Sequence, residues 1–294
     1  MRLELREVLL NRLGAVRPIA RALRRARLLL RPADRERIVD SSFKRLEMRR
    51  QLLGDERIRG ASLVEIGSGS EFCLALLLLA LGARRVVNVE IYADGFRRDA
   101  GLYRLLVERA VARGLPISWP PPGLLVEPGG RVVRPDPARI ALHLGVSAAA
   151  IPEMDQSADL TFSVAVLEHV LREHMPAVAH DLYRVTRPGG TGYHRVDLVD
   201  HYHRQDDPFR FLRFSAREYD SMYRNRLSYS NRYRLDDLER IFRQAGFSHV
   251  GFESVERYPD QEEFNRRLGT FDPEFRERDP EMLRVRTCVL VLAR

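Results

Sequence analysis

The sequence is poor in cysteine and in long apolar runs, and each shortage excludes a class of protein. Its 294 residues include two cysteines, Cys73 and Cys288, which are far apart and form no metal-binding or redox motif. So few cysteines favour a reducing compartment, and we expect a cytoplasmic protein. The apolar run Phe72–Leu81 is too short for a membrane-spanning helix, so we predict no transmembrane segment. Charged residues interrupt the N-terminus throughout, and no secretory signal is evident.

Lysine is almost absent, so arginine carries nearly all of the positive charge. Lys44 is the only lysine, and the formal net charge is +8 at pH 7. This excess allows a nucleic-acid partner but does not require one, and we find no recognisable RNA-binding module. Hydrophobic residues at 45% and charged residues at 31% are typical of a soluble globular protein.

One stretch of the sequence predicts half of a nucleotide-binding α/β unit. A short buried strand over Leu63–Ile66 leads into the tight turn Gly67-Ser68-Gly69-Ser70, which is followed by a buried helix over Phe72–Leu81. A second strand, Val86–Val89, ends at Glu90. Glycines let a ligand approach the backbone closely, and an acid at this place can accept hydrogen bonds from both hydroxyls of a ribose. A purely structural turn is the alternative interpretation of the glycines.

The rest of the chain continues to alternate strands with helices, which favours an α/β fold with a parallel sheet covered on both faces. Further strands are expected at Ile140–Leu144, Asp159–Val166, Thr191–Val196, Phe247–Val255 and Thr287–Leu292. Helices are expected at Asp94–Arg113, from the segment after Val170 to about Val185, and at Leu235–Ala245.

Additions to this unit are predicted at the N-terminus and in three insertions. Residues 1–55 form an N-terminal helical cap before the main domain, 56–294. The cap includes the arginine-dense segment Met1–Arg31 and a helix over Ala33–Leu53. We favour a cap packed on the domain over an arm that touches a membrane surface or an acidic partner.

The insertions differ in composition. Residues 116–138 are rich in proline and glycine and predict a loop, which we interpret as a flap near the ligand. Residues 201–234 are rich in aromatic side chains and predict either a substrate-side insertion or a satellite core of buried rings. Residues 257–284 are charged, and we expect them to be peripheral.

Several motifs occur together in an order and spacing that resemble the class I S-adenosylmethionine-dependent methyltransferases. They are Glu65-Ile66-Gly67-Ser68-Gly69, Glu90, Asp159, Leu167-Glu168-His169-Val170 and Arg187-Pro188-Gly189-Gly190. The resemblance covers about Leu63 to Val196. It implies a Rossmann-like seven-stranded sheet with the last strand antiparallel, and S-adenosyl-L-methionine as the cofactor.

The resemblance also implies roles for individual residues. The turn formed by Glu65, Gly67, Ser68 and Gly69 would line the methionine part of the cofactor. Glu90 would hold the ribose hydroxyls, Ile91 or Tyr92 would pack on the adenine, and Leu167, Glu168 and His169 would border cofactor and substrate. Two positions depart from the family pattern: Ser70 replaces the third glycine of the turn, and Ser147 lies near the place of the acid that pairs with the adenine amine in many members.

Three histidines, His169, His194 and His201, are the candidate catalytic residues, because they lie at or beyond the ends of the fourth and fifth strands. Three interpretations of this region are open. In the first, the polar groups there only form hydrogen bonds within the loop. In the second, either His194 or His201 is a general base. The third, which we do not adopt, is a metal site formed by His194, Asp197, Asp200 and His201.

The preferred function is methyl transfer to an oxygen or nitrogen of a small organic molecule, over which the proline-rich and aromatic insertions close. An RNA methyltransferase and a non-catalytic binding protein of the same fold are the alternatives. A nicotinamide dehydrogenase is less favoured, because the glycine turn lacks the full spacing of that fingerprint.

Overall fold

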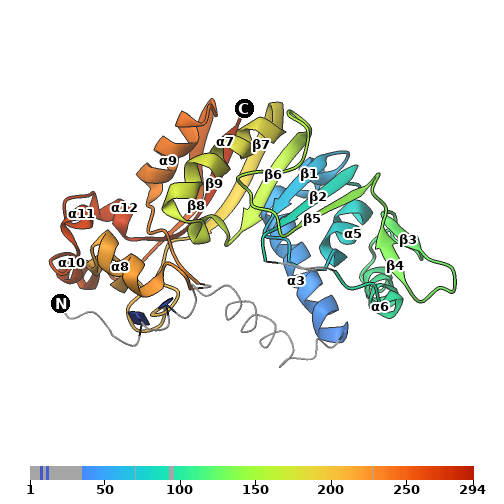
Figure 1. The fold of residues 1–294 in the computed structure, drawn as a ribbon, viewed down its shortest axis with the longest axis horizontal. Coiled ribbons are helices and arrows are strands. Elements are labelled where there is room, and N and C mark those ends of the chain that lie inside the picture. Colours follow the sequence, from blue (N-terminus) through green and yellow to red (C-terminus); the bar gives the residue numbers. More distant parts are fainter. Residues whose placement is uncertain (1–6, 9–10, 13–34, 70, 93–95, 227) are drawn as a thin grey trace.

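Seven strands of the computed structural model form one mixed sheet (Figure 1). The structure describes residues 7–8, 11–12, 35–69, 71–92, 96–226 and 228–294. The strands are β1 (Ser62–Ile66), β2 (Arg85–Glu90), β5 (Ile140–Leu144), β6 (Ala158–Val164), β7 (Thr186–Asp197), β8 (His249–Arg257) and β9 (Val285–Ala293). Their order is β5-β2-β1-β6-β7-β9-β8, and β9 runs antiparallel to both of its neighbours. The predicted Rossmann-like sheet with an antiparallel last strand is confirmed.

The centre of the sheet is apolar because both of its faces are covered. All five residues of β1 are buried, and so are all eight residues of helix α5 (Cys73–Ala80). A helix that is apolar on every side can only be stable inside the protein, and α5 lies between the sheet and the outer helices. The glycine turn therefore connects two rigid, buried elements.

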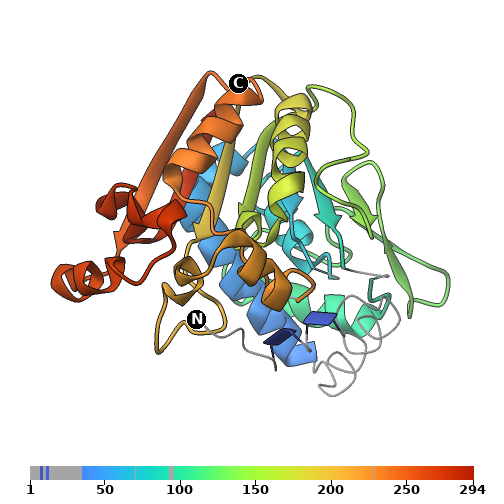
Figure 2. The ribbon, with the colours of Figure 1, turned by 60° about the vertical axis from the view of Figure 1, so that its left-hand side comes forward.

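Helices pack on both faces of the sheet (Figures 1 and 2). α3 (Arg35–Leu53), α5 and α6 (Ala100–Val111) share one hydrophobic core, whereas α7 (Met175–Val185) and α9 (Leu235–Gln244) share the other. The helix predicted over Ala33–Leu53 is confirmed as α3. The remainder of the arginine-dense segment Met1–Arg31, apart from residues 7, 8, 11 and 12, lies outside the described residues.

Two local predictions differ from the structure. α6 begins at Ala100 instead of near Asp94, because the Asp99 side chain accepts a hydrogen bond from the Gly101 N–H and caps the helix. The fifth strand is longer than predicted, since β7 begins at Thr186 instead of Thr191 and includes Arg187-Pro188-Gly189-Gly190. These four residues lie in an irregularity where the pairing with β6 shifts register.

The predicted insertions take two forms. Residues 116–138 include a hairpin of β3 (Leu124–Val126) and β4 (Val133–Pro135), at the end of the molecule where β5 is the edge strand (Figure 1). The hairpin is attached to the start of α6, because the Val133 N–H donates to the Arg98 carbonyl and the Ala100 N–H to the Arg131 carbonyl.

The other two insertions form one subdomain with its own core at the opposite end (Figure 1). Its helices are α8 (Ala216–Tyr223), α10 (Gln261–Leu268), α11 (Pro273–Arg276) and α12 (Pro280–Leu283). Phe264, Phe271 and Phe275 are buried against rings such as Phe209 and Phe211, so the charged segment 257–284 supplies part of the core of this subdomain. Among the helices that the structure describes, none is long and apolar enough to cross a membrane.

Candidate active site

The turn after β1 requires glycine for two separate reasons. Gly67 and Gly69 have φ angles of 76° and 81°, in the left-handed region that side chains disfavour. A Cβ atom at Gly67 would also lie 2.4 Å from Cγ2 of Val166, which follows β6. The turn is held against β2 by a hydrogen bond of 2.8 Å from the Gly67 N–H to the Val89 carbonyl. Ser70, the last residue of the turn, lies outside the described residues.

Glu90 lies directly beside this turn at the end of β2. One carboxylate oxygen accepts a hydrogen bond of 3.0 Å from the Gly69 N–H, and the other accepts one of 2.8 Å from the Tyr92 N–H. The next two side chains are unusually open for large apolar residues: Ile91 is 52% exposed and Tyr92 is 55% exposed. Backbone donors, a carboxylate and an open apolar surface therefore meet at the carboxyl ends of β1 and β2.

Glu65, predicted to line the cofactor, is fully buried and paired with an arginine of α3. Its Oε1 lies 2.5 Å from Nη2 of Arg49, and both side chains are at most 5% exposed. Arg45, one turn earlier on α3, donates a hydrogen bond of 3.2 Å to the Ser68 carbonyl. Sequence analysis missed both arginines, although their spacing of four residues on a predicted helix indicates one shared face. Glu65 thus couples β1 to the helix that supports the turn.

Glu168 follows β6 in a short 3-10 helix, Leu167–His169, and is almost completely buried. Its Oε1 accepts a hydrogen bond of 3.3 Å from the Asp197 N–H at the end of β7, and its Oε2 has no hydrogen-bond partner within the described residues. Burial raises the pKa of Glu168 to about 8, and the nearby Asp197 carboxylate adds to the rise. The carboxyl group is therefore largely protonated at pH 7 in the protein alone.

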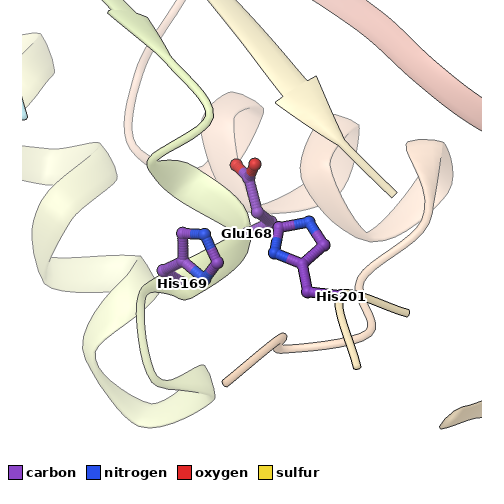
Figure 3. Close-up of side chains that lie close together, drawn as sticks. All are labelled: Glu168, His169 and His201. Atoms are coloured by element: carbon purple, nitrogen blue, oxygen red, sulfur yellow. The ribbon is translucent and has the colours of Figure 1, made fainter. Parts of the chain in front are cut away.

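His169 and His201 form a pair beside Glu168 (Figure 3). Their ring centroids are 4.8 Å apart in an edge-to-face arrangement. His169 Nδ1 lies 2.7 Å from the Tyr229 carbonyl, which can only accept, so Nδ1 carries the proton and Nε2 keeps its lone pair. Burial lowers the pKa of His169. His201 Nε2 lies 3.5 Å from a carboxylate oxygen of Asp197.

His194 is separate from this pair. It is fully buried between β6 and β9, with Nδ1 2.9 Å from the Ser163 hydroxyl and its ring over Phe242 of α9. Burial lowers the pKa of His194 to about 3, so the imidazole stays neutral over most of the pH range. His194 therefore belongs to the core under α9, and its position does not support a role as a general base.

The four residues considered above as metal ligands do not come together. Asp200 accepts hydrogen bonds from the Tyr202 and His203 N–H groups in a local turn, and His194 points into the core. His201 lies instead with Glu168 and His169. Strand alternation separates the side chains of β7, whereas the loop after it folds back over the end of β6.

A segment that is distant in sequence holds the 3-10 helix in place. The Asn231 N–H donates to the Glu168 carbonyl at 2.8 Å, and the Asn231 side chain donates to the carbonyls of Leu167 at 2.7 Å and Val170 at 3.0 Å. Together with the Tyr229 carbonyl, these bonds orient both candidate site residues of the 3-10 helix, Glu168 and His169. Neither Tyr229 nor Asn231 was a predicted site residue, and their sequence carries no local signal of this role.

A cavity of about 360 Å³ opens at the same end of the sheet, beside the ends of β6 and β7. Its wall includes Met48 of α3, Ala165, Arg195, Asp197, Arg204 and Arg286. Asp197 forms an ion pair with Arg204 and also faces His201, so the cavity adjoins the histidine pair.

Comparison with known families identifies this arrangement. A family model described as a methyltransferase domain matches residues 34–250, which is most of the chain. The chain belongs to the methyltransferase domain family. It is a class I S-adenosylmethionine-dependent methyltransferase, as the sequence motifs predict.

Solved structures similar to the methyltransferase are distant in sequence. One is phosphoethanolamine N-methyltransferase 2 from Haemonchus contortus with S-adenosylhomocysteine, at 16% identity and a TM-score of 0.41, over 80% of this chain and 49% of that one. The chain thus spans about half the length of the nematode enzyme. Another is an S-adenosylmethionine-dependent methyltransferase from Mesorhizobium loti, at 14% identity and a TM-score of 0.42, over 81% of this chain and 93% of that one. None of the curated proteins compared with the chain matches it.

The residues of the methyltransferase fit its cofactor. Gly67 and Gly69 carry no Cβ atoms, so a ligand can approach the backbone of the turn closely at these two residues. Glu90 already accepts two hydrogen bonds from backbone N–H groups, and the same oxygens suit two ribose hydroxyls. Ile91 and Tyr92 offer the exposed apolar surface that a base ring would cover.

Proposed function

We propose that the methyltransferase transfers a methyl group to an oxygen or nitrogen of a small organic acceptor. The observation that carries this proposal is the position of the Glu168–His169–His201 cluster. It occupies the carboxyl ends of β6 and β7, next to the glycine turn of β1 in the sheet order. Val166, two residues before Glu168, is the side chain nearest to Gly67, so the two loops meet.

The bound cofactor supplies an electrophilic methyl group on sulfur. The acceptor atom forms the new bond to the methyl carbon, the electron pair of the broken C–S bond stays on sulfur, and the proton of the acceptor must leave. The protein contributes alignment of the acceptor and removal of that proton. His201 supports this second role because it is only partly buried and lies 3.5 Å from Asp197 in the cavity wall, and the partly buried His169 packs against it.

Glu90 provides the test of cofactor binding. Replacing Glu90 by Ala removes two charge-assisted acceptors, and each such bond contributes roughly 1.5–3 kcal/mol. We expect calorimetry to show S-adenosylhomocysteine binding weakened by roughly 100-fold or more. Glu253→Ala, which removes an exposed acid of β8, is the matched control and should bind as the wild type. Equal affinities for the two variants would contradict the assignment of Glu90.

The acceptor class is tested by transfer of a labelled methyl group to panels of small molecules and of RNA. Transfer to hydroxyl- or amine-bearing small molecules supports the proposal. Methyl transfer to RNA alone, together with RNA binding that weakens steeply as the salt concentration rises, would instead support an RNA methyltransferase. Tight cofactor binding without transfer to any acceptor would favour a binding protein.

A further inference from the structure

Glu168, His169 and His201 offer three ligand atoms, one from each side chain, that all lie within 4.8 Å of one another (Figure 3). We propose that these three side chains bind a divalent first-row cation such as Zn²⁺. One carboxylate and two imidazoles form the donor set of zinc sites that leave a further position for water or substrate. The proposal that a cation binds is independent of the methyl acceptor, whereas its catalytic consequence rests on the function proposed above.

A buried carboxylate oxygen in the cluster lacks the partner that burial normally demands. Within the described part of the chain, Oε2 of Glu168 accepts no hydrogen bond. The Glu168 side chain is 1% exposed, so water does not reach it freely. Buried polar groups without partners are rare in proteins, and a cation bound to Glu168 would satisfy this oxygen.

The surroundings of the ligands are arranged as in known metal sites. The backbone carbonyl of Tyr229 takes the Nδ1 proton of His169, which leaves Nε2 as the free donor atom. The hydrogen bonds of Asn231 fix the 3-10 helix that carries Glu168 and His169. Asp197 lies 3.5 Å from His201 and adds negative charge, although Arg204 pairs with the same carboxylate.

The spacing of the ligand atoms requires only small adjustments. Zn–N and Zn–O bonds of about 2.0–2.2 Å place tetrahedral ligand atoms roughly 3.3–3.6 Å apart. Contraction from separations of up to 4.8 Å corresponds to an inward movement of about 1 Å or less for each atom.

The consequence for the reaction concerns an oxygen acceptor. A cation here would coordinate the acceptor hydroxyl at its open position and lower the pKa of that hydroxyl. The proton would leave to solvent, and the coordinated oxygen would then attack the methyl carbon. The two histidines would act as ligands in this scheme, and the cation would replace a general base.

Cobalt titration of tag-free, chelator-treated protein tests the site directly. We expect saturable uptake of one Co²⁺ per chain with visible absorption bands, and displacement by Zn²⁺. His169→Gln and His201→Gln should each weaken Co²⁺ binding at least 10-fold. His180→Gln, which replaces an exposed histidine of α7, should leave it unchanged. Circular dichroism and S-adenosylhomocysteine calorimetry on each variant establish that it is folded.

The outcomes separate the two proposals. Absence of one-to-one Co²⁺ uptake by the wild type, or wild-type affinity in both ligand variants, overturns the metal site. If S-adenosylhomocysteine still binds in that case, the proposed function stands. Specific Co²⁺ uptake with no binding of S-adenosylhomocysteine supports the site and overturns the proposed function. Full transfer activity in the chelated enzyme removes the catalytic role of the cation.

Discussion

Substitution of Gly67 by alanine separates two physical reasons for a glycine in the cofactor turn. The first is backbone conformation, since φ at Gly67 is 76°. An L-residue in this region costs about 1–2 kcal/mol. The second is close approach, because the new Cβ would lie 2.4 Å from Cγ2 of Val166. Overpacking of this kind costs about 1–3 kcal/mol, so the total destabilisation is about 2–5 kcal/mol.

Gly60 is a matched control for the first reason alone. Its φ of 75° is nearly the same, but a Cβ there would have no atom within 4 Å. Gly60→Ala should therefore cost only about 1–2 kcal/mol. The difference between the two variants measures the contact with Val166.

Urea denaturation followed by circular dichroism measures the free energies of unfolding of both variants. In a Val166→Ala background the contact is absent, so Gly67→Ala should become no more costly than Gly60→Ala. Equal costs of the two glycine substitutions in the wild-type background would refute the argument from close approach. Failure of Val166→Ala to reduce the cost would refute it as well.

Two further predictions concern buried titratable groups in the metal-free protein. Glu168 has a pKa of about 8 in the folded state and 4.5 ordinarily, so the native state retains a proton that the unfolded state loses. The free energy of unfolding of the wild type should therefore fall by up to about 1.4 kcal/mol per pH unit from pH 4.5 to 8. In urea denaturation with chelator present, Glu168→Gln should abolish this dependence on pH. For His194 the ordinary pKa is 6.5 and the folded value about 3, so the unfolded state binds a proton first as the pH falls. The free energy of unfolding should therefore drop by up to about 1.4 kcal/mol per pH unit from pH 6.5 towards 3. It should drop less steeply in His194→Asn, because the amide oxygen of asparagine can still accept a hydrogen bond from Ser163. Identical acid denaturation of the wild type and the variant would contradict the buried neutral imidazole.

Local patterns determined much of the sheet in advance. The β-branched run before Glu90 and the apolar run after the glycine turn predicted β2 and α5 to within a few residues. The strand at Ile140–Leu144 was predicted without error. Such segments are short apolar runs bounded by charged residues or by glycine, so neighbouring residues suffice to recognise them.

Contacts between distant segments decided what the sequence pattern left open. Residues 201–234 and 257–284 are separated in the sequence by α9 and β8, yet their rings share one core. This burial favours the satellite core over the substrate-side alternative for most of the aromatic side chains.

The sequence by itself determined the α/β fold, the glycine turn and the acid at Glu90, because each depends on neighbouring residues or on a fixed spacing. The tertiary structure decided which histidines belong together. His194 and His201 are both near the end of β7, but strand alternation turns His194 into the core while the following loop brings His201 to His169. Burial of Glu65 against Arg49, and of Glu168 beside the histidine pair, likewise depends on packing between elements that no local pattern encodes.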